Sequence, residues 1–108
     1  MTVVRPPGSP FNVLPGEIVS NHFSLRLHNR EKTDRAFAIL VKGPTNIEVV
    51  TAQNPLPVPA GEQQRTEVFV NLPSPDLPEG KVPVLIQIFG EGRLLAEQWI
   101  TFLGPKSP

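Results

Sequence analysis

The feature that most constrains this chain is a two-residue alternation of apolar and polar side chains, repeated in short runs. In the stretch HFSLRLH, Phe23, Leu25 and Leu27 share one face, while Ser24 and Arg26 share the other. Alternation over about five to nine residues is typical of half-buried β-strands. The same pattern recurs in five further segments, which are DRAFAILVKG, NIEVVT, RTEVFVNL, VPVLIQIFG and LLAEQWITFLG. The short segment NIEVVT is expected near a sheet edge.

Prolines and glycines fall between these runs, in stretches such as RPPGSP, LPGE, NPLPVPAGE and GEGR. Proline interrupts helices and is tolerated at strand ends and turns, so the 14 prolines mark boundaries between strands. A short N-terminal strand near Val3–Val4 or Phe11–Val13 brings the count to about seven. Seven short strands in about 100 residues predict a single all-β domain over residues 1–108, an immunoglobulin-like Greek-key β-sandwich. The chain has no cysteine and no tyrosine, so the disulfide and tyrosine corner of antibody domains are missing.

The composition argues against several functional classes. Ten basic residues balance ten acidic ones, which gives no electrostatic reason to bind nucleic acid or an anionic membrane. The lack of cysteine excludes thiolate nucleophiles, zinc–thiolate sites and iron–sulfur ligation by this chain. No apolar run approaches the roughly 18 residues that a membrane-spanning helix needs, and no signal peptide is visible.

His22 and His28 are the two histidines, and they lie six positions apart in one predicted strand. An even separation places both side chains on the same face of the strand, at a distance of roughly 20 Å. A metal ion needs donors about 2 Å from its centre, so one ion cannot bind both side chains. We therefore expect two surface histidines on the polar face of a sheet and no metal site.

The nucleophile search is equally negative, because no serine stands in a Gly-x-Ser-x-Gly setting. Glu62 and Glu67 could form an acid–base pair, but both are expected in polar, solvated positions. Asn21 and Asn29 flank the first long strand and are interpreted as local turn caps.

Three aromatic residues suggest a contact surface. Phe69, Phe89 and Trp99 each fall on the face opposite the aliphatic row of their strand. Exposed together, they would form an apolar patch suited to docking a partner. Coverage of that face by loops, or a slip in the alternation, is the alternative explanation.

Several stretches taken together resemble one family. The segment RPPGSPFNVLPGEIVSNHFSLRLHNR contains an Arg, a Pro followed by an aromatic residue, a short acidic turn and Asn-x-aromatic, and its strand ends in Asn-Arg. The segments RAFAILVKG, LPVPAGEQQRTEVFVNLP and VPVLIQIFG follow it. Over roughly residues 5 to 104, this pattern is similar to the C-terminal immunoglobulin-like domain of the FixG (CcoG) family of cytochrome c oxidase accessory proteins.

The resemblance implies a larger parent protein with transmembrane helices and an upstream portion that carries iron–sulfur clusters. It also implies a role in assembling the cbb-type oxidase, with reduction of copper for insertion. On this basis we expect a non-catalytic interaction domain at the periplasmic face of the inner membrane, with no cofactor of its own. Its partner would be an oxidase subunit or a copper-handling protein, and it would meet the membrane only through its parent. The alternative is a free-standing adhesive or carbohydrate-binding β-sandwich; a small hydrolase is a third, weaker hypothesis.

Overall fold

The computed structural model describes residues 1–76 and 79–105, and these residues form two antiparallel β-sheets packed face to face. The molecule is elongated, with extents of 53 × 27 × 20 Å. The described strands are β1 (Thr2–Val4), β2 (Asn12–Leu14), β3 (Ile18–His28), β4 (Arg35–Lys42), β5 (Glu48–Thr51), β6 (Leu56–Val58), β7 (Gln63–Pro73), β8 (Lys81–Gly90) and β9 (Arg93–Leu103), with one 3-10 turn at Ser74–Asp76.

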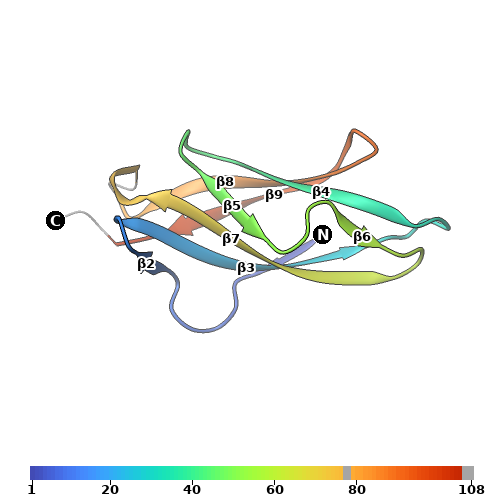
Figure 1. The fold of residues 1–108 in the computed structure, drawn as a ribbon, viewed down its shortest axis with the longest axis horizontal. Coiled ribbons are helices and arrows are strands. Elements are labelled where there is room, and N and C mark those ends of the chain that lie inside the picture. Colours follow the sequence, from blue (N-terminus) through green and yellow to red (C-terminus); the bar gives the residue numbers. More distant parts are fainter. Residues whose placement is uncertain (77–78, 106–108) are drawn as a thin grey trace.

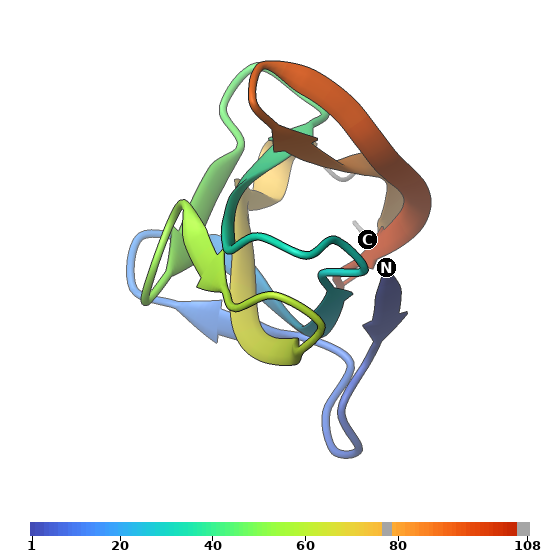
Figure 2. The same cartoon turned by 90° about the vertical axis from the view of Figure 1, so that its right-hand side faces the viewer.

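The five-stranded sheet has the order β1-β3-β7-β5, and β2 also pairs with β3 (Figure 1). The four-stranded sheet has the order β6-β4-β8-β9. Without β6, this is the ABED and CFG arrangement of immunoglobulin constant-type domains. Viewed along the long axis, the two sheets enclose the interior, and β9 curls toward β1 on one side (Figure 2). The predicted immunoglobulin-like sandwich is therefore confirmed.

The core consists of the inward-facing rows that the alternation predicted. On β7, for example, Val68, Val70 and Leu72 are fully buried, whereas Phe69 between them is exposed. The buried apolar side chains of the two sheets form one cluster, made of Val19, Phe23, Leu25, Leu27, Phe37, Ile39, Leu56, Val58, Val68, Val70, Leu72, Val84, Ile86, Ile88 and Phe102. β5 lies at the edge of its sheet, as expected for the segment NIEVVT.

The described residues contain nine strands where the sequence suggested about seven. β1 and β2 both form, and they pair with opposite ends of β3, so they act as one edge strand interrupted by the loop 5–11. β6 lies inside the proline-rich segment NPLPVPAGE, which was expected to connect two strands, and it pairs with β4. Strands of three residues are too short for a periodic pattern, and Pro57 within β6 obscures it further. No helix in the described part of the chain is long and apolar enough to cross a bilayer.

Candidate contact surface

The outer side of the four-stranded sheet carries a set of large apolar side chains. Cross-strand pairing sets Phe89 beside Leu94, and Leu85 beside Trp99, on neighbouring strands β8 and β9. These residues alternate with the buried row of β8, so their side chains point away from the core. We call the outward-facing residues Leu40, Leu85, Phe89, Leu94 and Trp99 the outer apolar face.

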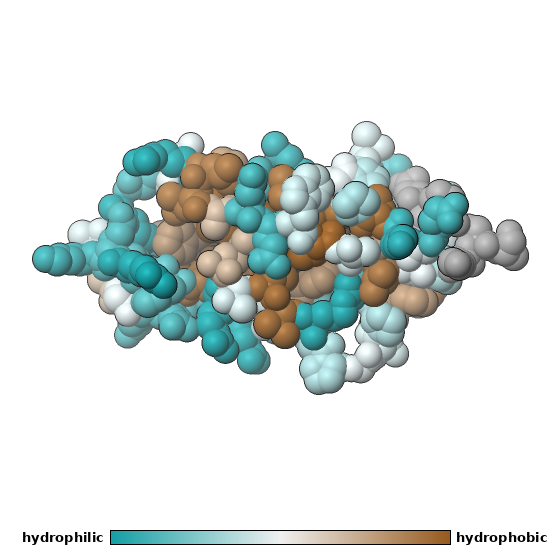
Figure 3. Space-filling model, turned by 180° about the vertical axis from the view of Figure 1, so that it is seen from behind, coloured by the Kyte–Doolittle hydropathy of each residue, from teal (hydrophilic) through white to brown (hydrophobic). Residues whose placement is uncertain are grey.

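The outer apolar face is accessible to a partner. Trp99 is 65% exposed, Leu94 46% and Leu40 43%. The face is also divided, because Gln87 and Glu97 form the row between its two ends and are joined by a hydrogen bond of 2.9 Å from Gln87 Nε2. The view from the side opposite to Figure 1 likewise shows several apolar areas on the surface, which are separated by hydrophilic residues (Figure 3). A partner on the outer apolar face would meet apolar areas around a polar centre.

The structure brings two of the three predicted contact residues to one face. Phe89 and Trp99 both lie on the outer apolar face, about 13 Å apart along the strands because four residues separate their rows. Phe69 lies on the outer side of the other sheet, where its ring stacks on His22 with the centroids 4.4 Å apart. Phe69 therefore cannot share a contact surface with Phe89 and Trp99.

Both histidines point outward from β3, on the same face, as the spacing predicted. The Nε2 atom of His22 lies 2.9 Å from Glu67 Oε1, and the hydroxyl of Ser24 donates to Glu67 Oε2 at 3.0 Å. The serine bonds the carboxylate and not the imidazole, so this arrangement differs from the serine–histidine pair of a nucleophilic site. Among the described residues, no three His, Asp or Glu side chains are grouped so that they could hold a metal ion.

The interpretation of Asn21 as a local turn cap was wrong. Asn21 lies within β3, is fully buried, and donates from Nδ2 to the Leu103 carbonyl at 2.7 Å. Its Oδ1 accepts from the Leu103 N–H at 2.9 Å and from Arg5 Nη1 at 3.1 Å. The amide thus replaces a neighbouring strand at the edge of β9 and joins the two sheets. Asn21 is on the same face of β3 as the buried residues Phe23 and Leu25. A polar residue in such an apolar row was the signal in the sequence that Asn21 is buried.

Arg5 completes this connection, which we call the Arg5–Asn21 clamp. Arg5 donates to the Thr101 carbonyl at 2.8 Å and to the Pro10 carbonyl, so it holds both β9 and the loop 5–11. Its guanidinium carbon lies 4.7 Å from the centroid of the Phe23 ring, a cation–π contact. Partial burial lowers the pKa of Arg5 from its ordinary value, but arginine remains charged in proteins.

Asn54 uses the same geometry at the opposite edge of the four-stranded sheet. Its Oδ1 accepts from the Ile39 N–H at 2.9 Å, and its Nδ2 donates to the Ile39 carbonyl at 2.8 Å. At each edge of this sheet, a side-chain amide thus takes the place of a neighbouring strand at one residue, which is Leu103 on β9 and Ile39 on β4. Asn29 does cap its own turn, since Oδ1 accepts from the Glu31 N–H, but it also bonds the distant Val58 carbonyl.

The fold and this surface define the class of the protein: an immunoglobulin-like β-sandwich domain with an exposed apolar sheet face. A family model described as "IG-like fold at C-terminal of FixG" matches residues 1–105, and the chain belongs to this family. The same description gives oxidoreductase as the proposed class of the FixG protein.

Two solved structures are similar to this chain. The crystal structure of a FixG-related protein from Vibrio parahaemolyticus has a TM-score of 0.80 at 20% identity, over 95% of this chain and 93% of that one. The GAE domain of GGA2p from Saccharomyces cerevisiae covers 98% of this chain and 97% of its own at 13% identity, but its TM-score of 0.38 is too low to support an argument. The first of them independently supports the fold. The sequence matched no curated protein.

Proposed function

We propose that this domain is a non-catalytic contact domain that positions a FixG-type accessory protein during assembly of a cbb-type cytochrome c oxidase. The observation that carries the proposal is the outer apolar face, where Trp99 exposes 65% of its surface. Tryptophan is enriched among the residues that dominate binding energy at protein interfaces. Large apolar side chains gathered on one sheet face are typical of a docking surface.

The chemistry of the polar clusters agrees with a binding role. His22 and Ser24 both bond the carboxylate of Glu67 and not each other, so the serine–imidazole hydrogen bond of a serine nucleophile is missing from this cluster. Redox chemistry in the parent then belongs to iron–sulfur clusters in its upstream portion, and the domain itself holds no cofactor. We place the domain at the periplasmic face of the inner membrane, with an oxidase subunit or a copper-handling protein as its partner.

Cell fractionation tests the parent protein first. An immunoblot with an antibody against this domain should give a membrane-bound band several times larger than the 11.9 kDa of this chain. A soluble band at the mass of this chain would contradict the proposed parent.

Site-specific cross-linking then tests the surface. A photoreactive residue at position 99 of the full-length parent should form an adduct with an oxidase subunit or a copper-handling protein. The same residue at Arg65, which is exposed on the other sheet, serves as the control and should form none. Equal adducts from both positions, or none from position 99, would contradict the use of the outer apolar face.

One observation favours a second candidate, the binding of carbohydrate. An exposed indole ring is a suitable platform for a sugar, and Trp99 is the only tryptophan of the chain, so its fluorescence reports on that position alone. Titration with oligosaccharides should leave the emission unchanged if the domain binds proteins. A saturable shift would favour the carbohydrate-binding function.

A further inference from the structure

We propose that a cavity at one end of the sandwich binds an aliphatic chain that ends in a carboxylate. The cavity lies between the two sheets, where β3 ends and the turn between β8 and β9 begins, and its volume is about 330 Å³. This volume falls at the lower end of the range for small-molecule sites. The site is separate from the outer apolar face, because neither Trp99 nor Leu40 lines it.

The inner walls of the cavity are apolar. Side chains from both sheets contribute to them, and the most important are Leu27, Phe37, Ile88, Leu95 and Ala96. At a liquid-like volume of about 30 Å³ per small group, the space accepts on the order of ten non-hydrogen atoms. This corresponds to a medium-length aliphatic chain.

Two local features shape this end of the interior. The pairing of β8 and β9 shifts by one residue between Ile88 and Phe89, which inserts Leu95 as an extra residue on β9. Gly90 has no side chain, and a Cβ there would lie 2.7 Å from Leu95 Cδ1. The missing side chain gives Leu95 the room to lie over Gly90 at the wall of the cavity.

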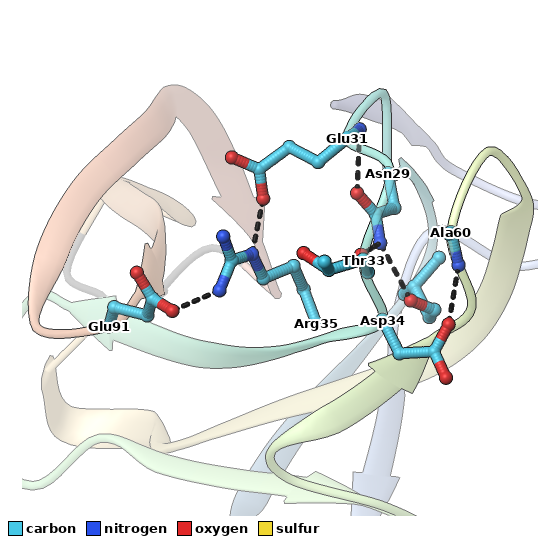
Figure 4. A network of polar contacts seen from close by, with 8 residues as sticks. Asn29, Glu31, Thr33, Asp34, Arg35, Ala60 and Glu91 are labelled. Carbon is cyan, nitrogen blue, oxygen red and sulfur yellow. Dashed lines mark hydrogen bonds and ion pairs between the residues drawn. The ribbon is translucent and has the colours of Figure 1, made fainter.

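The mouth of the cavity is held by a polar network (Figure 4). Arg35 on β4 pairs with Glu31 in the loop after β3 and with Glu91 in the turn between β8 and β9. The hydrogen bond from Arg35 to Glu31 raises the pKa of the guanidinium above its ordinary value. Glu91 takes a left-handed conformation with φ of 52°, which is unfavourable for a residue with a side chain. A strained glutamate therefore stands where its carboxylate reaches Arg35.

A second group of contacts fixes the loop after β3. Asn29 is 1% exposed, and its Nδ2 donates to the carbonyls of Thr33 and Val58, each at 2.9 Å. Asp34 Oδ1 accepts from the Ala60 N–H at 2.9 Å (Figure 4). The loops around the mouth are therefore ordered before any ligand arrives, which lowers the entropic cost of binding.

The charges at the mouth select the head group of the ligand. Both glutamates that line the cavity pair with the same arginine, Arg35. Arg30 and Arg93 also line it, and neither makes an ion pair within the described residues. The mouth thus carries an excess of positive charge above an apolar interior, which complements a carboxylate on an aliphatic chain.

Titration of the 108-residue chain with sodium decanoate, followed by methyl NMR, tests the proposal. We expect saturable shifts at the methyl groups of Leu27, Ile88 and Leu95. The indole N–H signal of Trp99, followed in ¹H–¹⁵N spectra of the same samples, should stay unchanged as an internal reference. Affinity should rise about fourfold for each methylene from hexanoate to decanoate, since each buried methylene contributes a similar free energy. Decanol and decyltrimethylammonium should bind at least about tenfold more weakly, because they lack the negative head group.

Two variants and one control complete the test. Ala96→Phe fills the cavity and should abolish the shifts, whereas Ala36→Phe adds the same ring to the exposed side of β4 and should preserve them. Arg93→Glu reverses the charge of an exposed side chain at the mouth, and it should weaken the binding of decanoate at least about tenfold. Shifts that centre on Trp99, equal binding of the alcohol and the ammonium compound, or unchanged affinity in Arg93→Glu would each overturn the proposal.

Discussion

Replacing Asn21 with alanine removes three hydrogen bonds, two of which join the two sheets, and we expect it to be among the most destabilising polar substitutions in the domain. Two of these bonds connect the side-chain amide to the backbone of Leu103, and the third comes from Arg5. An intramolecular hydrogen bond contributes about 1 kcal/mol net to stability, so the loss should be about 3 kcal/mol. Leu103 is half-buried, so water can bond part of the backbone that Asn21 leaves. The loss of stability should therefore not exceed this figure by much.

The free energy of unfolding from urea titrations measures this loss directly. A loss of about 3 kcal/mol is a large part of the 5–15 kcal/mol that stabilises a typical domain. Asn12→Ala is the matched control, because Asn12 is exposed on β2 and should cost less than about 0.5 kcal/mol. A loss below about 1 kcal/mol in Asn21→Ala, or one equal to that of the control, would refute the role assigned to the Arg5–Asn21 clamp.

Three further predictions concern stability. Trp99→Ala should change the free energy of unfolding by less than about 0.5 kcal/mol, whereas Phe102→Ala, on the same strand but fully buried, should cost about 3–5 kcal/mol; equal losses would place Trp99 in the core. Gly43→Ala should lower the free energy of unfolding by about 1–3 kcal/mol in the same titration, because the new Cβ would lie 2.8 Å from Cγ1 of the buried Val84. No loss would mean that the backbone after β4 moves away from Val84 at little cost. Glu91→Gly relieves the left-handed strain but removes the ion pair with Arg35, and salt screens that pair. The free energy of unfolding of the variant, compared with that of the unsubstituted chain, should therefore rise between low salt and about 1 M NaCl. A difference that does not depend on salt would contradict this balance.

The strands could be predicted from the sequence because most of them are half-buried. When one face of a strand is exposed to solvent, apolar and polar residues alternate along its sequence. The buried row of Val68, Val70 and Leu72 can therefore be recognised without a structure. The sequence could not predict all three short strands, β1, β2 and β6. Each has only three residues, which is too short to show a two-residue alternation, and such a strand depends on its partner strand for stability.

The partners of the buried polar side chains could not be predicted from the sequence, for a different reason. Asn21 and Leu103 are 82 residues apart, and an asparagine before a strand has the local signature of a turn residue. The structure also explains part of the family pattern in physical terms. Arg5, Asn21 and Phe23, which carried the resemblance, form one cluster in which the arginine bonds the asparagine and covers the aromatic ring.

The predicted contact residues show the limit of a face assigned from alternation. The pattern correctly indicates that Phe69, Phe89 and Trp99 point away from the aliphatic rows. It cannot tell which sheet each strand joins, and Phe69 lies on the other sheet from Phe89 and Trp99. Only the pairing of strands distant in the sequence decides which outward residues share a surface.

The most direct test of the proposed function compares the two outer faces in the proposed full-length parent. The double variant Leu40→Ala and Trp99→Ala removes apolar side chains from the outer apolar face, and Phe69→Ala does the same on the other sheet. Both changes affect exposed side chains, so the amount of folded protein should stay the same. The measurement is the activity of the cbb-type oxidase in membranes from cells that produce each variant. We predict a clear loss of oxidase activity in the double variant and none in Phe69→Ala; full activity in the double variant, with the protein present at its normal level, would contradict the account.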